Sequence, residues 1–338
     1  DSKLKLKKSA DKRVFLTNQN CDSLMANNSN FFHVIDIDPF GSFSAHVPFA
    51  LKSIKHDGLL CLTATDTAVL FKNRLKCRMK YDTLINKTPW FAEMGLRAAI
   101  SYIARQAAIN EMAIEPVLSL SVDFYIRIFI RIKRNKTSAK KCLESLNYFY
   151  TCQCGYFLQL DRQGGIGNKN SKSCDQSEES KNVFNKNKCP ICFQSLVLCG
   201  PLWTGKLHDL NFVESLPESE DKRVQNYLKM IKQEKSALFY HSISKISKLL
   251  KMDCPPMLVI LSELLKRGYL VSFSHCMANA VKTDCPYTEM IKIFKENLLN
   301  SKNNKEFDPE AIKMCNTKYN REIMNMNGGP GSRYKKNK

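Results

Sequence analysis

The sequence predicts a layered α/β fold, because short apolar strands alternate with an amphipathic helix in its first third. Residues 34–37 form a continuous apolar-rich run that is typical of a buried parallel strand. Residues 45–54 follow with apolar side chains at helical spacing, and residues 59–63 form the next apolar run. In such folds the ligand site lies at the carboxyl ends of the strands.

Further elements follow this unit along the chain. Residues 14–17 predict a short strand, and residues 89–113 predict a long helix. Residues 118–132 predict a strand, since isoleucine alternates with other residues towards its end. Arg127 and Arg131 lie on the opposite face of that strand. We favour a solvated face for them over contacts with phosphate.

The basic stretch 133–138 predicts a linker and divides the chain. We expect a first domain over 1–135, a second over 136–315 and a basic, disordered tail over 316–338. Residues 163–187 are rich in Gly, Asn, Ser and Lys, which indicates a mobile loop.

The second domain ends in a compact helical pattern. Residues 242–250 and 256–267 predict two helices, and residues 269–274 predict a strand after Gly268. Helices followed by a strand in this way resemble a winged-helix arrangement.

The charge balance favours a polyanionic partner. The 338 residues include 52 Lys and Arg against 32 Asp and Glu, a net charge of +20. Such an excess is typical of nucleic-acid binding, with a membrane surface or a Lys/Asn-rich genome as the alternatives. We expect no membrane span and no signal peptide, since no run reaches about 18 apolar residues and the first residues lack an apolar core.

The 14 cysteines indicate a reducing compartment, because most lie singly within apolar segments. We therefore expect an intracellular, soluble protein. The nucleus is the favoured compartment, and the mitochondrion or the cytoplasm is the alternative. No obligate protein partner is inferred.

The residues Asp38, Pro39, Phe40 and Gly41 follow the first buried strand and suit chemistry on a flat amine. The Asp38 carboxylate and the Pro39 carbonyl can each accept a hydrogen bond from an exocyclic NH2, and Phe40 can stack on a base. Gly41 allows a sharp turn beside a ligand. The alternative is an ordinary turn in which Asp38 caps a local backbone group.

Two cysteine pairs predict a structural zinc site. Cys152 and Cys154 lie about 35 residues before Cys189 and Cys192, and four thiolates suit tetrahedral Zn2+. The first pair has one residue fewer between its cysteines than the usual spacing, so Cys174 or Cys199 could replace a ligand. The other alternative is a set of unligated thiols. Neither His nor carboxylate lies at ligand spacing, so we expect no catalytic zinc.

The chain resembles the tRNA (guanine-26) N2,N2-dimethyltransferases in their eukaryotic form. The resemblance runs from about residue 14 to residue 300 and is specific because its motifs occur together and in order. Beside the two cysteine pairs, these motifs are residues 34–42, 58–70, 93–97, 116–131, 200–209, 272–275 and 279–284.

The resemblance implies transfer of one or two methyl groups from S-adenosylmethionine to the exocyclic N2 of a guanine in tRNA. It implies that Asp38 and the Pro39 carbonyl orient the amine and that Phe40 stacks on the extruded base. By position, Asn20 and Cys21 match an Asp-Ala pair beside the cofactor adenine, and Ala92 replaces a histidine that is common in the family.

The resemblance also implies the fold: an incomplete Rossmann-like class I methyltransferase domain, then an α+β tRNA-binding domain with a zinc-knuckle insertion over 152–192 and a winged-helix-like segment. The family's glycine-bearing cofactor loop has no counterpart here, since no glycine precedes Gly41. We therefore expect this chain to hold S-adenosylmethionine poorly. The alternative function is a truncated or degenerate paralogue that binds tRNA without catalysis.

Overall fold

The computed structural model describes residues 7–8, 14–160, 188–299 and 307–316. A four-stranded mixed sheet with the order β3–β4–β6–β5 forms the framework of the site. The strands β3 (Phe32–Ile37) and β4 (Ile54–Ala64) are parallel. The strands β5 (Met112–Val122) and β6 (Tyr125–Arg134) form an antiparallel hairpin, and β6 pairs with β4. The predicted α/β class is confirmed, and β3 lies at an edge of this sheet.

Helices cover one face of the sheet because the strands present apolar side chains there. The isoleucines of β6 are fully buried in the same apolar cluster as α2 (Val47–Ser53) and the long central helix α5 (Phe91–Ile109). The helix α6 (Lys136–Leu143) packs beside α5 and β5. On the other face, α8 (Leu210–Ser215) and α9 (Lys222–Gln233) pack against β5 through a smaller apolar cluster.

Shorter elements complete this half of the molecule. The strands β1 (Lys7–Lys8) and β2 (Phe15–Leu16) form a hairpin, and α1 (Cys21–Asn27) precedes β3. The helices α3 (Thr67–Lys72) and α4 (Arg74–Tyr81) follow β4. A second antiparallel sheet has the order β8–β7–β9, from β7 (Leu146–Thr151), β8 (Phe157–Gln159) and β9 (Val197–Trp203).

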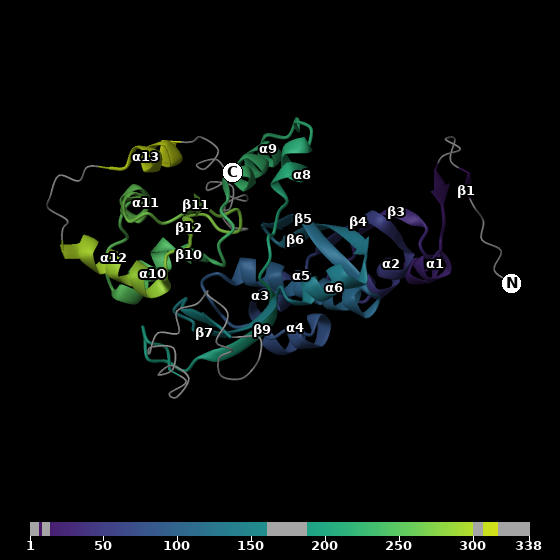
Figure 1. Ribbon diagram of the computed structural model, residues 1–338, viewed down its shortest axis with the longest axis horizontal. Helices are drawn as coiled ribbons and strands as arrows, with labels where there is room; N and C mark the ends of the chain where they lie inside the picture. The colour runs from purple at the N-terminus through teal and green to yellow at the C-terminus, as the bar shows by residue number, and fades with distance from the viewer. Residues whose placement is uncertain (1–6, 9–13, 161–187, 300–306, 317–338) are drawn as a thin grey trace, which may run out of the picture.

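The C-terminal elements form their own apolar cluster, drawn in green to yellow at the left of Figure 1. A three-stranded antiparallel sheet has the order β10–β12–β11. Its strands are β10 (Tyr240–Ser242), β11 (Val271–Phe273) and β12 (Ala280–Thr283). The helices around it are α10 (Ile243–Leu250), α11 (Met257–Lys266), α12 (Tyr287–Leu299) and α13 (Pro309–Asn316).

The prediction of one strand over 118–132 was wrong. Two strands meet there, because Asp123 and Phe124 form a tight turn between β5 and β6, with Asp123 at a φ of +45°. No glycine marks this turn, so the isoleucine alternation of β6 hides it in the sequence. Aspartate tolerates the left-handed region better than most residues.

The predicted linker over 133–138 was also wrong. Residues 133–134 end β6, and α6 begins two residues later with Asn135 as its N-cap, whose side chain accepts a hydrogen bond from the Ser138 N–H (2.8 Å). The largest apolar cluster contains Ile132 on one side of this stretch and Phe149 and Trp203 on the other. The domain boundaries given above therefore remain a proposal.

The other predicted elements are present with shifted ends, whereas α1, α3 and α4, which border the turn after β3, were not predicted. The predicted loop over 163–187 and the tail after residue 316 lie outside the described residues. Within the described ranges, no helix is both long and apolar enough to cross a membrane.

Candidate active site

The turn after β3 is fixed to the neighbouring strand. Gly41 has a φ of +102°, which residues with a side chain rarely adopt. Its N–H donates to Thr65 Oγ1 (2.8 Å), and its carbonyl accepts from the Thr65 N–H (2.9 Å). Thr65 directly follows β4, so residues 38–41 are held at the carboxyl ends of two parallel strands. The predicted turn at the end of a buried strand is thus present, and its role as the site remains a proposal.

The functional groups of this turn are available to a ligand. The ring of Phe40 is fully exposed at 110% of its reference area. The Asp38 carboxylate has no hydrogen-bond or ion-pair partner among the residues that the structure describes, so the alternative in which Asp38 caps a local group is wrong. The Asp38 carboxylate and the Phe40 ring, two residues apart, are therefore both accessible to a ligand.

Hydrogen bonds from side-chain hydroxyl groups anchor the residues that directly follow the turn. Ser42 Oγ donates to the Tyr81 hydroxyl (2.8 Å), which donates to Asp66 Oδ1 (2.8 Å). The Tyr102 hydroxyl donates to the carbonyl of Ser44 (2.7 Å). Burial raises the pKa of Tyr81, so this hydroxyl stays neutral and serves as a donor. These hydrogen bonds fix the backbone after Gly41, so the turn is preorganised in the absence of a ligand.

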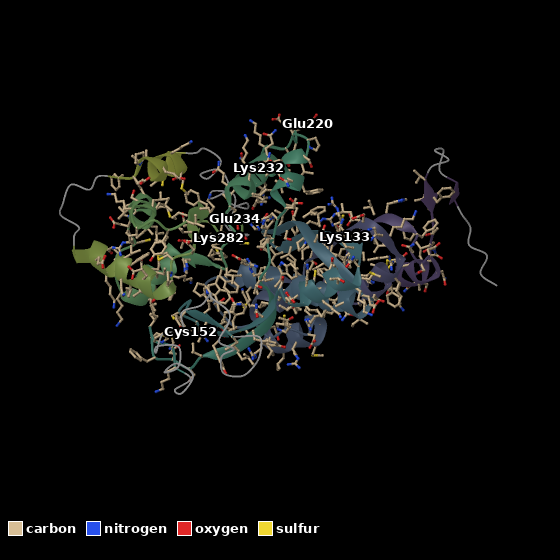
Figure 2. All side chains as sticks on the ribbon, in the orientation of Figure 1. Lys133, Cys152, Glu220, Lys232, Glu234 and Lys282 are labelled. Atoms are coloured by element: carbon tan, nitrogen blue, oxygen red, sulfur yellow. The ribbon has the colours of Figure 1, made fainter. Side chains whose placement is uncertain are left out.

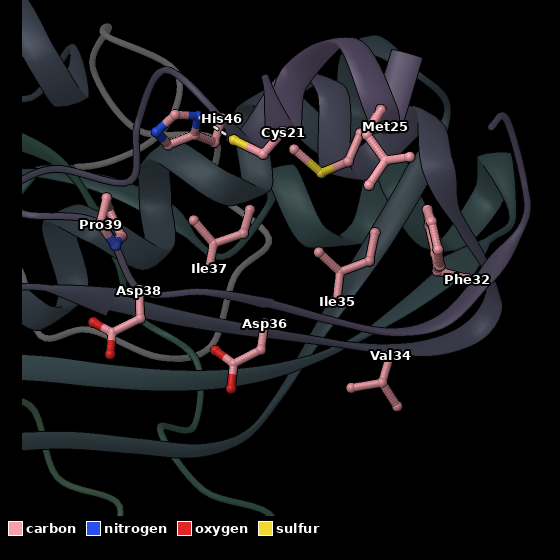
Figure 3. A pocket seen from close by; sticks show the side chains of 11 residues that line it. Cys21, Met25, Phe32, Val34, Ile35, Asp36, Ile37, Asp38, Pro39 and His46 are labelled. Carbon is pink, nitrogen blue, oxygen red and sulfur yellow. Dashed lines mark hydrogen bonds between the residues drawn. The ribbon is translucent and has the colours of Figure 1, made fainter. Parts of the chain in front are cut away.

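A cavity of about 370 Å³ lies along the open edge of β3, within the range of roughly 300–1,000 Å³ that ligand sites occupy. In Figure 3, Ile35 and Ile37 point towards Met25 of α1, whereas the carboxylates of Asp36 and Asp38 point to the other face of the strand. The cavity therefore has an apolar wall on one side and an acidic rim on the other.

The two predicted cofactor residues lie at the start of α1. Cys21 lines the cavity with an exposed thiol, whereas Asn20 is the N-cap of the helix. The Asn20 Oδ1 atom accepts hydrogen bonds from the N–H groups of Asp22 (2.8 Å) and Ser23 (3.1 Å). Its amide oxygen is thus engaged by the helix, and the amide NH2 remains available.

A bidentate ion pair beside the turn was not predicted. Arg127 donates to both carboxylate oxygens of Asp36 (2.8 and 2.7 Å) and to Thr63 Oγ1 (2.6 Å). The hydrogen bonds to the Asp36 carboxylate raise the pKa of Arg127. The solvated face expected for Arg127 was therefore wrong. The pairing across β3, β4 and β6 is a long-range contact that periodicity does not reveal.

The four predicted cysteines come together at one end of the β8–β7–β9 sheet. The Cys152 and Cys192 sulfur atoms are 3.3 Å apart, and those of Cys154 and Cys189 are 3.5 Å apart. All four sulfur atoms lie within 4.8 Å of one another. Tetrahedral zinc with Zn–S bonds of about 2.3 Å requires S–S distances of roughly 3.8 Å, so the donor set fits zinc.

The shortened first pair reaches the cluster because its turn is tight. Gly155 has a φ of +113°, and its N–H donates to the Cys152 carbonyl (3.1 Å). Hydrogen bonds from Cys152 and Cys154 lower the pKa of Cys189, which favours a thiolate at this position. Cys199 is no substitute ligand, since its thiol contacts the Thr151 hydroxyl instead (3.1 Å). The alternative Cys174 lies outside the described residues.

A buried ionic network joins α5 to the C-terminal sheet and was also missed. The Lys282 ammonium lies 3.3 Å from Glu93 Oε1 and 3.0 Å from Glu234 Oε1, and Figure 2 labels Lys282 next to Glu234. Arg97 donates to Glu93 Oε1 (2.8 Å), and His275 Nδ1 lies 2.6 Å from Glu234 Oε2. All five side chains are at most 3% exposed.

The charges of this network stabilise one another. Burial alone would raise the pKa of Glu234, but His275 and Lys282 hold it well below its usual range. Burial alone would lower the pKa of Lys282, but Glu93 and Glu234 raise it. Glu93, Arg97, His275 and Lys282 come from the motifs 93–97, 272–275 and 279–284, and Glu234 ends α9. Three segments quoted for the resemblance therefore meet in the core, away from the turn at Asp38.

Comparisons with known proteins assign the family. A sequence model of the N2,N2-dimethylguanosine tRNA methyltransferases matches residues 2–295. The chain belongs to this family.

Relatives within the family cover most of the chain. The tRNA (guanine(26)-N(2))-dimethyltransferase of Schizosaccharomyces pombe is 33% identical over 79% of this chain and 51% of its own length. The human enzyme of the same name is 30% identical over 79% of this chain and 42% of its own length. The chain thus spans about half the length of these curated relatives.

A solved structure supports the fold. Trm1 from Pyrococcus horikoshii, determined in complex with S-adenosyl-L-methionine, matches with a TM-score of 0.68 and 27% identity. The match covers 82% of this chain and 70% of that protein. The α/β architecture and the membership predicted from the motifs are therefore confirmed.

Proposed function

We propose that this protein is a tRNA guanine-N2 methyltransferase, which transfers methyl groups from S-adenosylmethionine to the guanine at position 26 and holds that guanine at the turn of residues 38–41. One observation carries this proposal: the turn of residues 38–41, inside the family match, is rigidly held while Asp38 and Phe40 stay unoccupied. Preorganised groups of this kind are what catalysis by orientation requires.

The turn suits the chemistry of guanine N2. This amine is a weak nucleophile, because its lone pair is delocalised into the ring. Hydrogen bonds from its two N–H groups to the Asp38 carboxylate and the Pro39 carbonyl would direct the lone pair towards the methyl donor. Phe40 would hold the extruded base by stacking. Asp38 would also accept the proton that the amine loses.

The cavity along β3 supports the placement of S-adenosylmethionine next to this turn, with its adenine near Asn20 and Cys21. Asn20 would donate from its amide NH2, since its oxygen caps α1. S-adenosylmethionine supplies the electrophilic methyl group. The apolar side chains of Met25, Ile35 and Ile37 would exclude water from the adenine.

The charge and the C-terminal elements support tRNA as the substrate. We propose that these elements form a winged-helix unit, which is supported by the order α9, β10, α10, α11, β11, β12 and by the position of β12 between β10 and β11. We propose that this unit contacts the tRNA backbone, because exposed lysines such as Lys245 and Lys248 lie on α10. An intracellular location follows from a tRNA substrate, and one relative is named as mitochondrial.

A methylation assay tests the function. We expect the protein, incubated with S-adenosylmethionine and tRNA, to produce N2-methylguanosine and N2,N2-dimethylguanosine, detected by mass spectrometry of digested tRNA. A transcript with adenine at position 26 is the matched control and should remain unmodified. Calorimetric titration of the present chain shows whether it binds the cofactor by itself. Tight tRNA binding with neither cofactor binding nor methylation would instead support the non-catalytic paralogue.

We also propose a structural zinc ion at Cys152, Cys154, Cys189 and Cys192, for which the sulfur geometry is the support. After dialysis against metal-free buffer, the protein should retain about one equivalent of zinc. The double variant Cys189→Ser, Cys192→Ser should lose this zinc and melt at a lower temperature, because metal binding supplies folding free energy here. The variant Cys254→Ser, at an exposed thiol, should retain both. A metal-free wild-type protein would refute the site.

A further inference from the structure

A second group of potential metal ligands lies at the rim of the β3 cavity, well separated in sequence from the four cysteines. The His46 Nδ1 atom is 2.7 Å from Asp22 Oδ1 and 3.8 Å from Cys21 Sγ. The Cys21 sulfur is also 3.8 Å from Asp22 Oδ1. One nitrogen, one oxygen and one sulfur atom therefore face a common point, and Figure 3 shows the His46 ring directed towards the Cys21 sulfur.

Among the described residues, these three side chains make no hydrogen bond to a backbone group. Asn20 provides the side-chain cap of α1, so the Asp22 carboxylate is not needed for that purpose. His46 is the N-cap of α2 but makes no side-chain capping bond. The imidazole and the carboxylate are each about one-quarter exposed, and the thiol is exposed. A cation can therefore reach all three ligands from solvent.

The chemistry of the set selects a soft divalent cation. Thiolate and imidazole ligands suit Zn2+, with a carboxylate as a common third ligand. With Zn–N and Zn–O bonds of about 2.0–2.2 Å and a Zn–S bond of about 2.3 Å, tetrahedral ligands lie roughly 3.3–3.8 Å apart. The observed separations need only a small outward shift of His46 from Asp22. Hard cations such as Mg2+ are disfavoured, since they prefer oxygen ligands.

We propose that Cys21, Asp22 and His46 form a three-ligand zinc site whose fourth position is open to water or to a ligand in the cavity. Cys21 and His46 both line the cavity, so the bound ion would form part of its rim. Three ligands and an open position distinguish this site from the closed four-cysteine site. Binding would replace the thiol proton of Cys21 with the metal and would use the His46 tautomer that carries its proton on Nε2. The proposal does not depend on methyl transfer.

Equilibrium dialysis with zinc tests the proposal on protein whose four-cysteine site is already loaded. We expect the wild-type protein to take up one further equivalent at micromolar zinc. The variants Cys21→Ser and His46→Ala should each lower the affinity of this second equivalent by at least about tenfold, since even the loss of an outer-shell partner costs roughly 10–100-fold. Cobalt binding should give a thiolate-to-metal absorption band that Cys21→Ser removes.

Matched controls separate this site from nonspecific binding. Cys254→Ser changes another exposed thiol, and His33→Ala changes another exposed imidazole. Both should keep the second equivalent and the cobalt band. Circular dichroism of each variant verifies that the fold persists. A wild-type protein that binds no zinc beyond the four-cysteine site, or a second equivalent that survives both Cys21→Ser and His46→Ala, overturns the proposal.

Discussion

Asp38→Ala is expected to abolish methylation of tRNA while tRNA binding persists. Alanine removes the acceptor that orients the guanine amine and takes up its proton, and losses of this kind lower kcat by about 10²–10⁴-fold. The Asp38 side chain makes no bond to the rest of the described structure, so its removal should leave the fold intact. The measurement is single-turnover methyl transfer by the complete polypeptide, together with tRNA affinity from filter binding.

The variant Glu218→Gln is the matched control, because Glu218 is an exposed carboxylate between α8 and α9, outside both the cavity and the C-terminal elements proposed to contact tRNA. Its methylation rate should equal that of the wild type. The role given to Asp38 fails if Asp38→Ala retains the wild-type rate. If tRNA affinity falls in parallel with the rate, Asp38 acts in binding instead of in the chemical step.

Lys282→Met is expected to destabilise the protein by about 3–5 kcal/mol, the usual cost of removing one partner from a buried ion pair. Methionine fills much of the lysine volume but leaves the carboxylates of Glu93 and Glu234 without the ammonium between them. Because this network joins α5 to the C-terminal sheet, both halves should unfold at lower urea concentration. Urea unfolding followed by tryptophan fluorescence measures the change, since Trp90 stacks on Phe239 at this junction.

The variant Lys248→Met removes an exposed lysine from α10 and should change the free energy of unfolding by less than about 0.5 kcal/mol. An unfolding midpoint for Lys282→Met equal to that of the control would show that the network does not hold the two halves together.

Much of the site was predictable because its signals are local. The apolar run before Asp38 fixes a strand, and proline and glycine after it fix a turn at the end of that strand. The cysteine pairs likewise carry their own ligand chemistry, even with one residue missing from the first pair. Each of these signals depends on neighbours within a few residues, so periodicity and residue type were sufficient to find them.

Other features were missed because they depend on contacts between distant segments. The turn at Asp123 lacks glycine, so the sequence merged two strands into one. The basic residues after it resemble a linker, yet they end a strand and begin a helix against a shared core. The sequence predicted a solvated Arg127, but the pairing of β6 with β4 places it opposite Thr63, from which its side chain reaches Asp36 on β3. The pairing of His46 with Cys21 likewise requires α1 and α2 to pack together.

The sequence by itself determined the family, the α/β class, the turn at Asp38 and the four cysteines. Strand patterns and ligand spacings depend on residues that lie close together in the sequence. Only the tertiary structure decided that Asp38 and Phe40 are unoccupied, that Asn20 caps a helix, and that Glu93, Glu234 and Lys282 form one buried network. The physical reason is that availability, burial and ion pairing are properties of packed neighbours, and those neighbours come from segments that lie far apart along the chain.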